Sequence, residues 1–375
     1  MKKILFVLGT RPEAIKLAPV ILAMKNSPTF QPFVCNTEQQ KELSSQTLGY
    51  FGLSSDYNLD VMRPNHTLSD LNARLLCSLN KILQTEHFDA IVVQGDTMSV
   101  FAGACVAFYN RIPVCHIEAG LRSFNVSEPF PEEALRQMVS RITAIHFAPT
   151  EKSKINLLEE KIPNENIFVV GNTVIDALHL VSEPVRENAR LLCKKKGIHL
   201  ERNPVLVTVH RRENHGTRLL QILRAITELA EKFSDKQFVI PVHPNPNVKV
   251  LVYRELSGLK NVVLTEPLDY PELIEIMRVA HVILTDSGGI QEEAPTFRVP
   301  LLVMRYKTER SEGVQSGFAK LVGADVEKIV NEASAVLSID YVGSRIVGVA
   351  NPYGDGNAAG KILSKLENSA IYKGD

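Results

Sequence analysis

Short apolar runs alternate with longer segments of helical periodicity along most of the chain. A first set of runs lies at Ile4–Leu8, Pro32–Cys35, Ala90–Gln94, Val114–Ile117, Ala144–Phe147 and Ile167–Val170. A second set lies at Val205–Val209, Phe238–Val242, Val262–Thr265, Val282–Thr285 and Leu301–Met304. Runs that are apolar throughout are typical of parallel strands covered on both faces. The alternation of strands with helices therefore predicts an α/β protein with doubly wound, Rossmann-like domains.

The domain organisation follows from the length and from one segment of different character. At about 150 residues per domain, a chain of 375 residues is expected to form two or three domains. Residues 172–202 have a helical pattern, so we place a boundary near Gly171. We expect an N-terminal domain, a C-terminal domain and a final helix that packs back on the N-terminal domain: residues 1–171, 172–355 and 356–375. The helices expected in the linking and final segments are Val174–Leu180, Pro184–Lys196 and Gly356–Tyr372.

Composition and charge exclude several classes of protein. The 42 basic and 42 acidic residues give a formal net charge of zero, which argues against a non-specific nucleic-acid binder. Hydrophobic residues make up 45% of the chain, too many for a disordered protein, and no apolar stretch is long enough to span a membrane. The N-terminal apolar run ends at Gly9 and is interpreted as a strand rather than a signal peptide. The five cysteines include no C-x-x-C pair, so we expect reduced thiols and a cytoplasmic location.

The candidates for function are the residues that follow each predicted strand, because ligands of open α/β sheets bind beyond the carboxyl ends of the strands. After the first strand, Gly9 permits a tight turn, and Arg11 and Lys16 lie near the start of a helix, a place that favours anions. A plain turn with two surface cations is the alternative interpretation. The dinucleotide pattern G-x-G-x-x-G does not occur here, which argues against a Rossmann dehydrogenase.

Acidic residues follow later strands of the first half. Asp96 and Glu118 come after two strands, and Glu132-Glu133 comes soon afterwards. Converging carboxylates cost free energy unless something uses or pairs them, and Arg122 and Arg136 are the candidate partners. Asp96 as a helix cap and Glu133 as an ordinary first-turn acid are the alternatives.

The second half offers histidines and a glycine-rich loop. His210 and His243 each follow a strand directly, as structural residues or as proton-transfer groups. No H-x-x-H or H-E-x-x-H spacing indicates a metal site. The strongest local signal is the Asp-Ser-Gly-Gly-Ile-Gln-Glu-Glu run at 286–293. Small residues let backbone N–H groups approach a phosphate, and Glu293 is placed to accept hydrogen bonds from a ribose; a simple turn is the alternative. Arg310 lies in a segment expected to border the same cleft.

Together, these segments resemble the non-hydrolysing UDP-N-acetylglucosamine 2-epimerase family of bacteria. The matching runs occur in family order and cover nearly the whole chain: 9–16, 95–97, 116–122, 131–134, 171–177, 210–213, 285–295 and 351–356. The resemblance implies a glycosyltransferase-B-like pair of Rossmann domains with the active site in the cleft between them, and a homodimer. It also implies a cofactor-free and metal-free interconversion of UDP-N-acetylglucosamine and UDP-N-acetylmannosamine, through loss of UDP to a 2-acetamidoglucal and re-addition, for surface polysaccharide precursors.

The resemblance also implies roles for individual residues. The expected catalytic residues are Asp96, Glu118, Glu132 and His210. The expected substrate-binding residues are Arg11, Lys16, Arg136, Ser287, Gly288, Gly289, Glu293 and Arg310. The UDP-sugar is also expected to act as an allosteric activator, at Gln39, Arg74, Arg211 and His243.

The chain departs from the family pattern at the edges of the expected site. Leu135 stands where asparagine is usual, and Leu273 stands where an aromatic residue is usual near the uracil pocket. These departures leave open a modified UDP-amino sugar as the substrate. A UDP-sugar glycosyltransferase of the same fold and a non-catalytic nucleotide-sugar sensor are further alternatives, and the carboxylates of the first half favour the epimerase.

Overall fold

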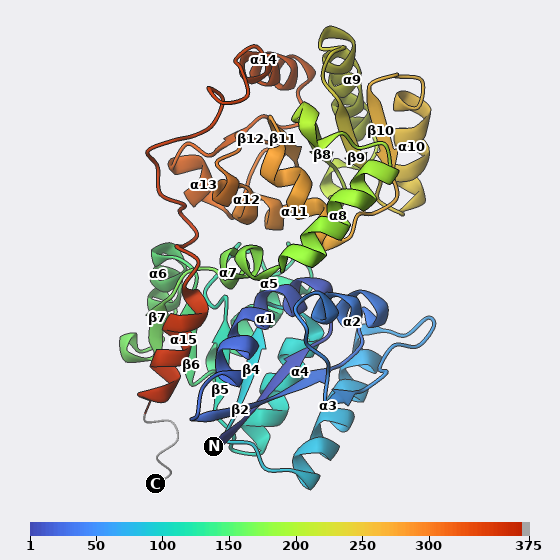
Figure 1. Cartoon of the computed structure of the whole chain (residues 1–375). Helices are drawn as coiled ribbons and strands as arrows, with labels where there is room; N and C mark the ends of the chain where they lie inside the picture. The colour runs from blue at the N-terminus through green and yellow to red at the C-terminus, as the bar shows by residue number, and fades with distance from the viewer. Residues whose placement is uncertain (370–375) are drawn as a thin grey trace. The chain divides into compact units, whose positions relative to one another are not determined.

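The chain forms two compact units in a computed structural model that describes residues 1–369 (Figure 1). The first unit comprises Met1–Leu180 and a returning segment that begins at Tyr353, and the second comprises Val181–Pro352. Each unit is built around a parallel sheet of its own. The first unit therefore extends to Leu180, beyond the boundary expected at Gly171.

The first unit has a seven-stranded parallel sheet in the order β3-β2-β1-β4-β5-β6-β7. The strands are β1 (Lys2–Leu8), β2 (Phe30–Asn36), β3 (Tyr57–Asn58), β4 (Ala90–Gln94), β5 (Val114–Ile117), β6 (Ile145–Ala148) and β7 (Ile167–Val169). The central strands are buried along their whole length, which explains why they are apolar throughout rather than alternating.

Helices cover both faces of this sheet. They are α1 (Arg11–Lys25), α2 (Lys41–Tyr50), α3 (Leu68–Thr85), α4 (Met98–Tyr109), α5 (Glu132–Ile142), α6 (Glu151–Glu159), α7 (Thr173–Leu180) and α15 (Ala358–Glu367). Helix α1 packs against α2, α7 and α15, whereas α4 packs between α3 and α5. Helices α3, α4 and α5 cover the face of β1 and β4 where the hydrophobic core includes Leu5, Val7, Leu75 and Val100.

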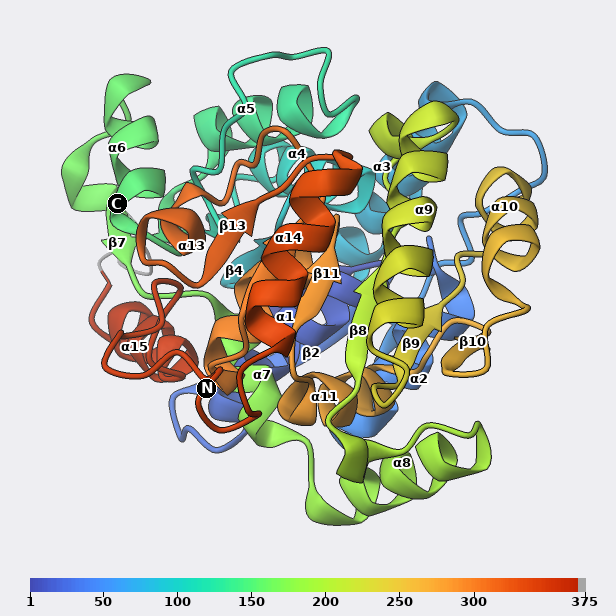
Figure 2. The same ribbon diagram turned by 90° about the horizontal axis from the view of Figure 1, so that it is seen from above.

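The second unit has a six-stranded parallel sheet in the order β10-β9-β8-β11-β12-β13. Its strands are β8 (Val205–Thr208), β9 (Phe238–Pro241), β10 (Val262–Thr265), β11 (Ile283–Thr285), β12 (Leu301–Val303) and β13 (Ala319–Leu321). Its helices are α8 (Glu183–Lys195), α9 (Thr217–Lys232), α10 (Pro246–Leu256), α11 (Tyr270–Val279), α12 (Gly288–Glu293), α13 (Ser311–Gln315) and α14 (Val326–Leu337). Figure 2 shows α9 and α14 side by side over one face of this sheet.

A clasp joins the start of α7 to the returning segment inside the first unit. The amide of Asn172 donates to the carbonyl of Tyr353 at 2.7 Å. A Cβ on Gly171 would lie 3.4 Å from the Cα of Gly354, so the two glycines allow the two backbones to touch. The Asp176 carboxylate then accepts hydrogen bonds from the first amides of α15, at 3.2 and 2.9 Å. Helix α15 packs on α1 and α7 (Figure 1).

The sequence predicted the fold class correctly. Two α/β units with parallel sheets, as in the glycosyltransferase-B-like class, are present, and each of the expected apolar runs coincides with a strand. The short edge strands β3 and β13 were not predicted, because two or three residues are too few to show a pattern. The helix expected over Gly356–Tyr372 is α15, shorter at both ends, and residues 370–372 lie outside the described residues.

Candidate active site

Both sheets reverse their strand order at one point, and the expected site residues follow the strands at these points. The reversal lies between β1 and β4 in the first sheet and between β8 and β11 in the second. Ligands of open α/β sheets bind beyond the carboxyl ends of the strands at such switch points. The segments after these four strands are 9–16, 95–97, 209–214 and 286–293. In each unit, therefore, candidate residues that are far apart in sequence gather at that unit's own switch point.

The turn from β1 into α1 is held by Glu13, a residue to which the sequence analysis gave no role. Its Oε2 accepts hydrogen bonds from the amides of Gly9 and Thr10, at 2.8 and 2.7 Å, and from the Thr10 hydroxyl at 2.8 Å. Its Oε1 accepts from the Thr97 hydroxyl at 2.5 Å. Burial raises the pKa of the Glu13 carboxyl, although these donors oppose the effect. Glu13 therefore ties the turns after β1 and β4 to each other.

Arg11 begins α1 beside this turn, and its amide donates to Gln40 Oε1 at 3.0 Å. Lys16, one turn further along α1, does not face open solvent. Its Nζ lies 2.6 Å from Oε2 of Glu118, and both side chains are about nine-tenths buried. The Gln94 amide donates to the same oxygen. Lys16, expected at the substrate, is thus also the charge partner of Glu118.

Glu118 has an unusual backbone. It follows β5 with a φ of 65°, in the left-handed region that costs free energy for any residue other than glycine. Strained residues of this kind are found where the surrounding structure imposes them, often at functional sites. The strain and the buried ion pair with Lys16 fix the position of this carboxylate.

Asp96 and Glu132 complete the acidic group of the first unit. Asp96 follows β4, the neighbour of β5, and its Oδ2 lies 3.0 Å from Nη2 of Arg136. Glu132 begins α5 four residues before Arg136, so both lie on one side of the helix. The Glu132 carboxylate is half-buried and has no ion-pair partner among residues 1–369. Asp96 is therefore charge-paired, whereas Glu132 is not.

The second candidate arginine, Arg122, does not pair with these carboxylates. Its Nε donates to Oε1 of Glu160 at 2.5 Å, and its Nη2 donates to the Ser140 hydroxyl at 2.7 Å. The adjacent acid Glu133 is fully buried and accepts hydrogen bonds from the amides of Ser123 and Phe124, at 2.9 and 3.2 Å. Glu133 and Arg122 hold the 121–131 loop, so their roles are structural.

In the second unit a buried carboxylate organises the segment that carries His210. Asp286, fully buried, accepts hydrogen bonds from the amide of His210 at 3.0 Å and from that of Arg211 at 2.9 Å. The Nδ1 atom of the His210 ring lies 3.1 Å from Asp286 Oδ1. The ring of His210 also stacks on that of His243, with centroids 5.9 Å apart. The sequence alone indicates no role for Asp286 beyond its place before the Ser-Gly-Gly loop.

The Ser287–Glu293 loop lies against a charged cluster. The Ser287 amide donates to the Thr285 hydroxyl at 2.9 Å. A Cβ on Gly288 would lie 2.7 Å from Cζ of Arg310, so this glycine allows the guanidinium to cover the loop. Gly289 follows with more room, because a Cβ there would meet Glu293 Oε1 only at 3.8 Å. The loop thus offers backbone groups and a guanidinium side by side.

Arg310 is held in place by two acids. Its Nε donates to Glu292 Oε1 at 3.0 Å, and its Nη1 pairs with Glu309. Burial favours the neutral form of Glu309, but the guanidinium groups of Arg310 and Arg305 outweigh it and hold the pKa of Glu309 at about 2. Arg310 therefore covers Gly288 as a fixed cation.

The residues expected to bind an activator divide between the two units. Gln39 accepts a hydrogen bond from the Ser99 hydroxyl at 3.0 Å, and Arg74 Nε donates to the Val61 carbonyl at 2.8 Å. Nη2 of Arg74 and Nε of Arg211 are buried without a hydrogen-bond partner among the described residues. Burial is the main cause of the lowered pKa of the Arg211 guanidinium. Burial and the neighbouring His210 likewise lower the pKa of His243.

A search of residues 1–369 gives no group of three or more His, Cys, Asp or Glu side chains that could hold a metal ion. Within the same residues, no helix has both the length and the hydropathy needed to cross a bilayer.

Two parallel α/β units with charged side chains at their switch points define a protein of the doubly wound α/β class, whose ligands bind at such points. The model of the family described as UDP-N-acetylglucosamine 2-epimerase matches residues 22–367. The UDP-N-acetylglucosamine 2-epimerase of Yersinia pestis is 44% identical over 373 residues, covering 98% of this chain and 99% of the relative. The chain belongs to this family of isomerases.

Solved structures show the same likeness. The UDP-GlcNAc 2-epimerase of Neisseria meningitidis bound to UDP-GlcNAc is 43% identical, with a TM-score of 0.89, covering 98% of this chain and all of that one. The Methanocaldococcus jannaschii enzyme in complex with UDP-GlcNAc and UDP is 34% identical, with a TM-score of 0.83 over 98% of this chain and 100% of that chain. The family resemblance inferred from the sequence is confirmed.

Proposed function

We propose that the chain interconverts UDP-N-acetylglucosamine and UDP-N-acetylmannosamine without a cofactor. The hydrogen on carbon 2 of the sugar is not next to a carbonyl group, so a base removes it only slowly. If UDP leaves first, carbon 1 becomes oxocarbenium-like, the hydrogen on carbon 2 becomes acidic, and its loss gives a 2-acetamidoglucal. A proton added to the opposite face of carbon 2, followed by re-addition of UDP at carbon 1, completes the inversion.

The acidic group of the first unit supports the proton transfers. Asp96, Glu118 and Glu132 lie beyond two neighbouring strands and at the start of the following helix, and this arrangement is the observation that carries the proposal. Asp96 and Glu118 each lie beside a cation, with Asp96 3.0 Å from Arg136 and Glu118 2.6 Å from Lys16. Glu132 lies one turn before Arg136 on α5 and forms no ion pair within the described residues. Positioned proton transfer typically contributes about 10²- to 10⁴-fold in rate.

The candidate residues of the second unit support the departure of UDP. The proposed donors for a diphosphate are His210, Arg310, the Ser287 hydroxyl and the backbone amides of Gly288 and Gly289, and Glu293 is the proposed acceptor for the ribose hydroxyls. In the first unit, Arg11 is the proposed further cation near the phosphates. Removing one donor aimed at a developing negative charge typically costs about 3 kcal/mol of barrier.

Incubation with UDP-N-acetylglucosamine in deuterium oxide, followed by proton NMR, tests the reaction. We expect deuterium at carbon 2 in both sugar nucleotides, together with UDP-N-acetylmannosamine. Absence of both deuterium and the manno product would contradict the proposal. Free N-acetylmannosamine and UDP as final products would instead indicate hydrolysis, and transfer only in the presence of a sugar acceptor would indicate a glycosyltransferase.

Single variants test the assignment of the carboxylates. Asp96→Asn, Glu118→Gln and Glu132→Gln should each lower turnover by about 10²-fold or more, because each removes a group proposed for proton transfer. UDP binding, measured by calorimetry, should stay close to that of the wild type. Glu151→Gln is the control, because Glu151 occupies the first turn of α6 as Glu132 does in α5, and it is exposed. Full activity of all three variants would show that the assignment is wrong.

We further propose that the UDP-sugar acts as an activator through Gln39, Arg74, Arg211 and His243. The support is the pair of buried guanidinium N–H groups of Arg74 and Arg211 without partners among residues 1–369, because such donors are costly until an acceptor binds. In Arg74→Met, added UDP-N-acetylglucosamine should no longer stimulate the reverse reaction, because the proposed activator site has lost a guanidinium group. If added UDP-N-acetylglucosamine does not change the reverse rate of the wild type either, the activator site is contradicted.

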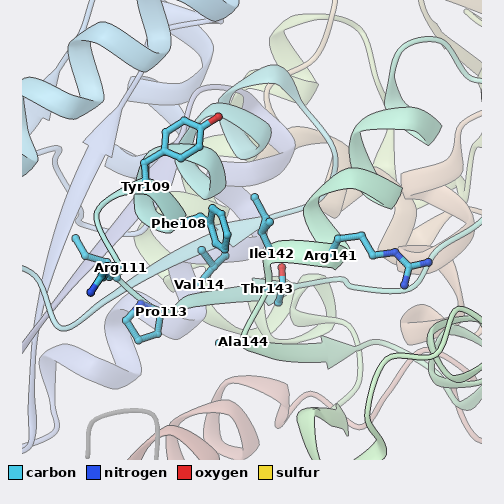
Figure 3. A pocket seen from close by; sticks show the side chains of 10 residues that line it. Phe108, Tyr109, Arg111, Pro113, Val114, Arg141, Ile142, Thr143 and Ala144 are labelled. Atoms are coloured by element: carbon cyan, nitrogen blue, oxygen red, sulfur yellow. The ribbon is translucent and has the colours of Figure 1, made fainter. Parts of the chain in front are cut away.

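A homodimer is also proposed, through the outer face of α4. This helix is apolar on both sides: Val100 and Ala104 face the core, whereas Phe108 is 55% exposed and Tyr109 72% exposed. A helix that is apolar all round is normally buried. Beside it lies a hollow of about 680 Å³, with Phe108 and Ile142 among its lining residues (Figure 3). A second copy of the chain is the proposed partner, because a twofold axis would set the same exposed aromatic residues against one another.

Phe108→Glu should convert the dimer to monomer, measured by sedimentation at micromolar concentration. Leu191→Glu on α8 is the matched control, because Leu191 is also 55% exposed but belongs to the second unit. A monomeric wild type, or a dimer unaffected by Phe108→Glu, would contradict this interface. The cytoplasmic location expected from the sequence stays a prediction.

A further inference from the structure

His210 and Asp286 form a carboxylate–imidazole pair at the switch point of the second sheet. His210 Nδ1 lies 3.1 Å from Asp286 Oδ1, and the stacked ring of His243, inclined by only 19°, limits rotation of the imidazole. The His210 side chain is 36% exposed whereas Asp286 is fully buried, so one edge of the ring faces the carboxylate. The opposite edge, with Nε2, is then the edge available to a ligand.

The register of the sheet explains this pairing. Strands β8 and β11 are neighbours with Thr208 opposite Thr285, and the two hydroxyls lie 2.6 Å apart. Asp286 follows Thr285 directly, and its amide donates to the Thr208 carbonyl at 3.2 Å. The carboxylate therefore lies beside the residues that follow Thr208, and His210 is the second of these.

Asp286 is also kept ionised by its surroundings. Burial disfavours the charged form, but the donors from His210, Arg211 and Asn214 outweigh it and lower the pKa of the Asp286 carboxyl. The Asn214 amide donates to Oδ2 at 3.0 Å, opposite the oxygen that faces the imidazole. An ionised carboxylate can only accept hydrogen bonds, so the facing ring nitrogen must carry a proton.

We propose that Asp286 is the positioning residue of His210: it holds the proton on Nδ1 and directs Nε2 to the diphosphate of the substrate. The proposal rests on the proposed function and names how one of its residues is set. With both nitrogens protonated, Nδ1–H donates to Asp286, and Nε2–H donates to a phosphate oxygen as the bond between carbon 1 and that diphosphate breaks. The electron pair of the broken bond stays on the departing UDP, and the same N–H holds UDP for re-addition.

Nitrogen-15 NMR of histidine-labelled protein tests the tautomer without any turnover. In the free enzyme we expect the neutral imidazole of His210 to carry its proton on Nδ1. In Asp286→Asn we expect the imidazole to lose this preference for the Nδ1 tautomer. Asn214→Ala is the matched control, since it removes another donor from the same carboxylate but leaves the imidazole contact intact. A wild-type His210 protonated on Nε2 alone would overturn the proposal, even if Asp286→Asn did not fold.

A double-mutant cycle separates positioning from a purely structural role. Asp286→Asn should lower kcat by about 10- to 100-fold, the range found for partners that orient metal-bound histidines. In a His210→Asn background the same change should cost less than about twofold, because it acts through a ring that is absent. An equal loss in both backgrounds would overturn the proposal. If the wild type shows no exchange at carbon 2 but has the expected tautomer, the proposed function fails and the positioning stands.

Discussion

Lys16 and Glu118, 102 residues apart in sequence, form a buried ion pair with Nζ 2.6 Å from Oε2. The pair joins the first helix to the end of β5, across the switch point of the first sheet. It connects stability with function, because the carboxylate proposed to move a proton also depends on this cation to remain charged inside the protein.

Loss of one partner of this pair should be strongly destabilising. Lys16→Met leaves a buried carboxylate without its cation, and breaking such a pair typically costs about 3–5 kcal/mol of unfolding free energy. The double variant Lys16→Met/Glu118→Gln should recover most of that loss, because no unpaired charge remains. Urea unfolding followed by circular dichroism measures both.

The control for this prediction is the exposed ion pair between Lys3 and Glu86, with 41% and 26% of the side chains exposed. Lys3→Met should cost at most about 1 kcal/mol. Equal losses for Lys16→Met and Lys3→Met would contradict the buried pair.

Gly120 should not tolerate a side chain. Its φ is +91°, and a Cβ would lie 2.2 Å from the carbonyl oxygen of Ser153, a backbone atom. Gly120→Ala should therefore lower the unfolding free energy by about 2–5 kcal/mol, from the backbone conformation and the clash together. Gly49→Ala is the control: it lies in α2 with nothing within 4 Å of the added Cβ, so it should be neutral or stabilising by up to about 1 kcal/mol. Comparable stability of the two variants would argue against this geometry.

Acid should weaken the first unit because it contains two buried histidines. Burial lowers the pKa of His116 to about 4 and that of His146 to about 3, against an ordinary value of 6.5. Below pH 6.5 the unfolded chain therefore binds protons that the folded chain does not, so stability is present above that pH and falls as the pH drops. Two such groups give a slope of about 2.4 kcal/mol per pH unit between pH 6 and 5.

His146→Leu should halve that slope and keep stability at pH 7, since the native imidazole is neutral there. The measurement is the urea midpoint as a function of pH. His87→Leu is the control, because His87 is exposed and its replacement should leave the slope as it is. A slope that does not change in His146→Leu would refute this explanation of acid sensitivity.

The sequence predicted the strands of both sheets, except the short edge strands β3 and β13, because their apolar runs reflect burial on two faces. The candidate residues were chosen at the strand ends, and their roles stay predictions. The sequence did not predict which charges would pair. Arg122 and Arg136 were equal candidates, and only the fold sends Arg122 to Glu160 and Arg136 to Asp96. The role of Asp286 depends on the register of β8 with β11, which no local pattern carries.

The motifs at 171–177 and 351–356 have no proposed role in the chemistry, and a backbone hydrogen bond from Asn172 to Tyr353 joins them. This contact gives a last prediction, on stability. Asp176 accepts hydrogen bonds from the amides of Ala358 and Ala359, and burial raises the pKa of this carboxyl. Asp176→Ala leaves those amides without an acceptor and should cost about 1–2 kcal/mol locally, so α15 should open more often.

Limited proteolysis should then cut near residue 358 about tenfold faster than in the wild type. Asp325→Ala, which removes the cap of α14 in the second unit, is the control and should not change that rate. An unchanged cleavage rate in Asp176→Ala would mean that packing of α15 on α1 and α7, rather than the cap, holds this helix.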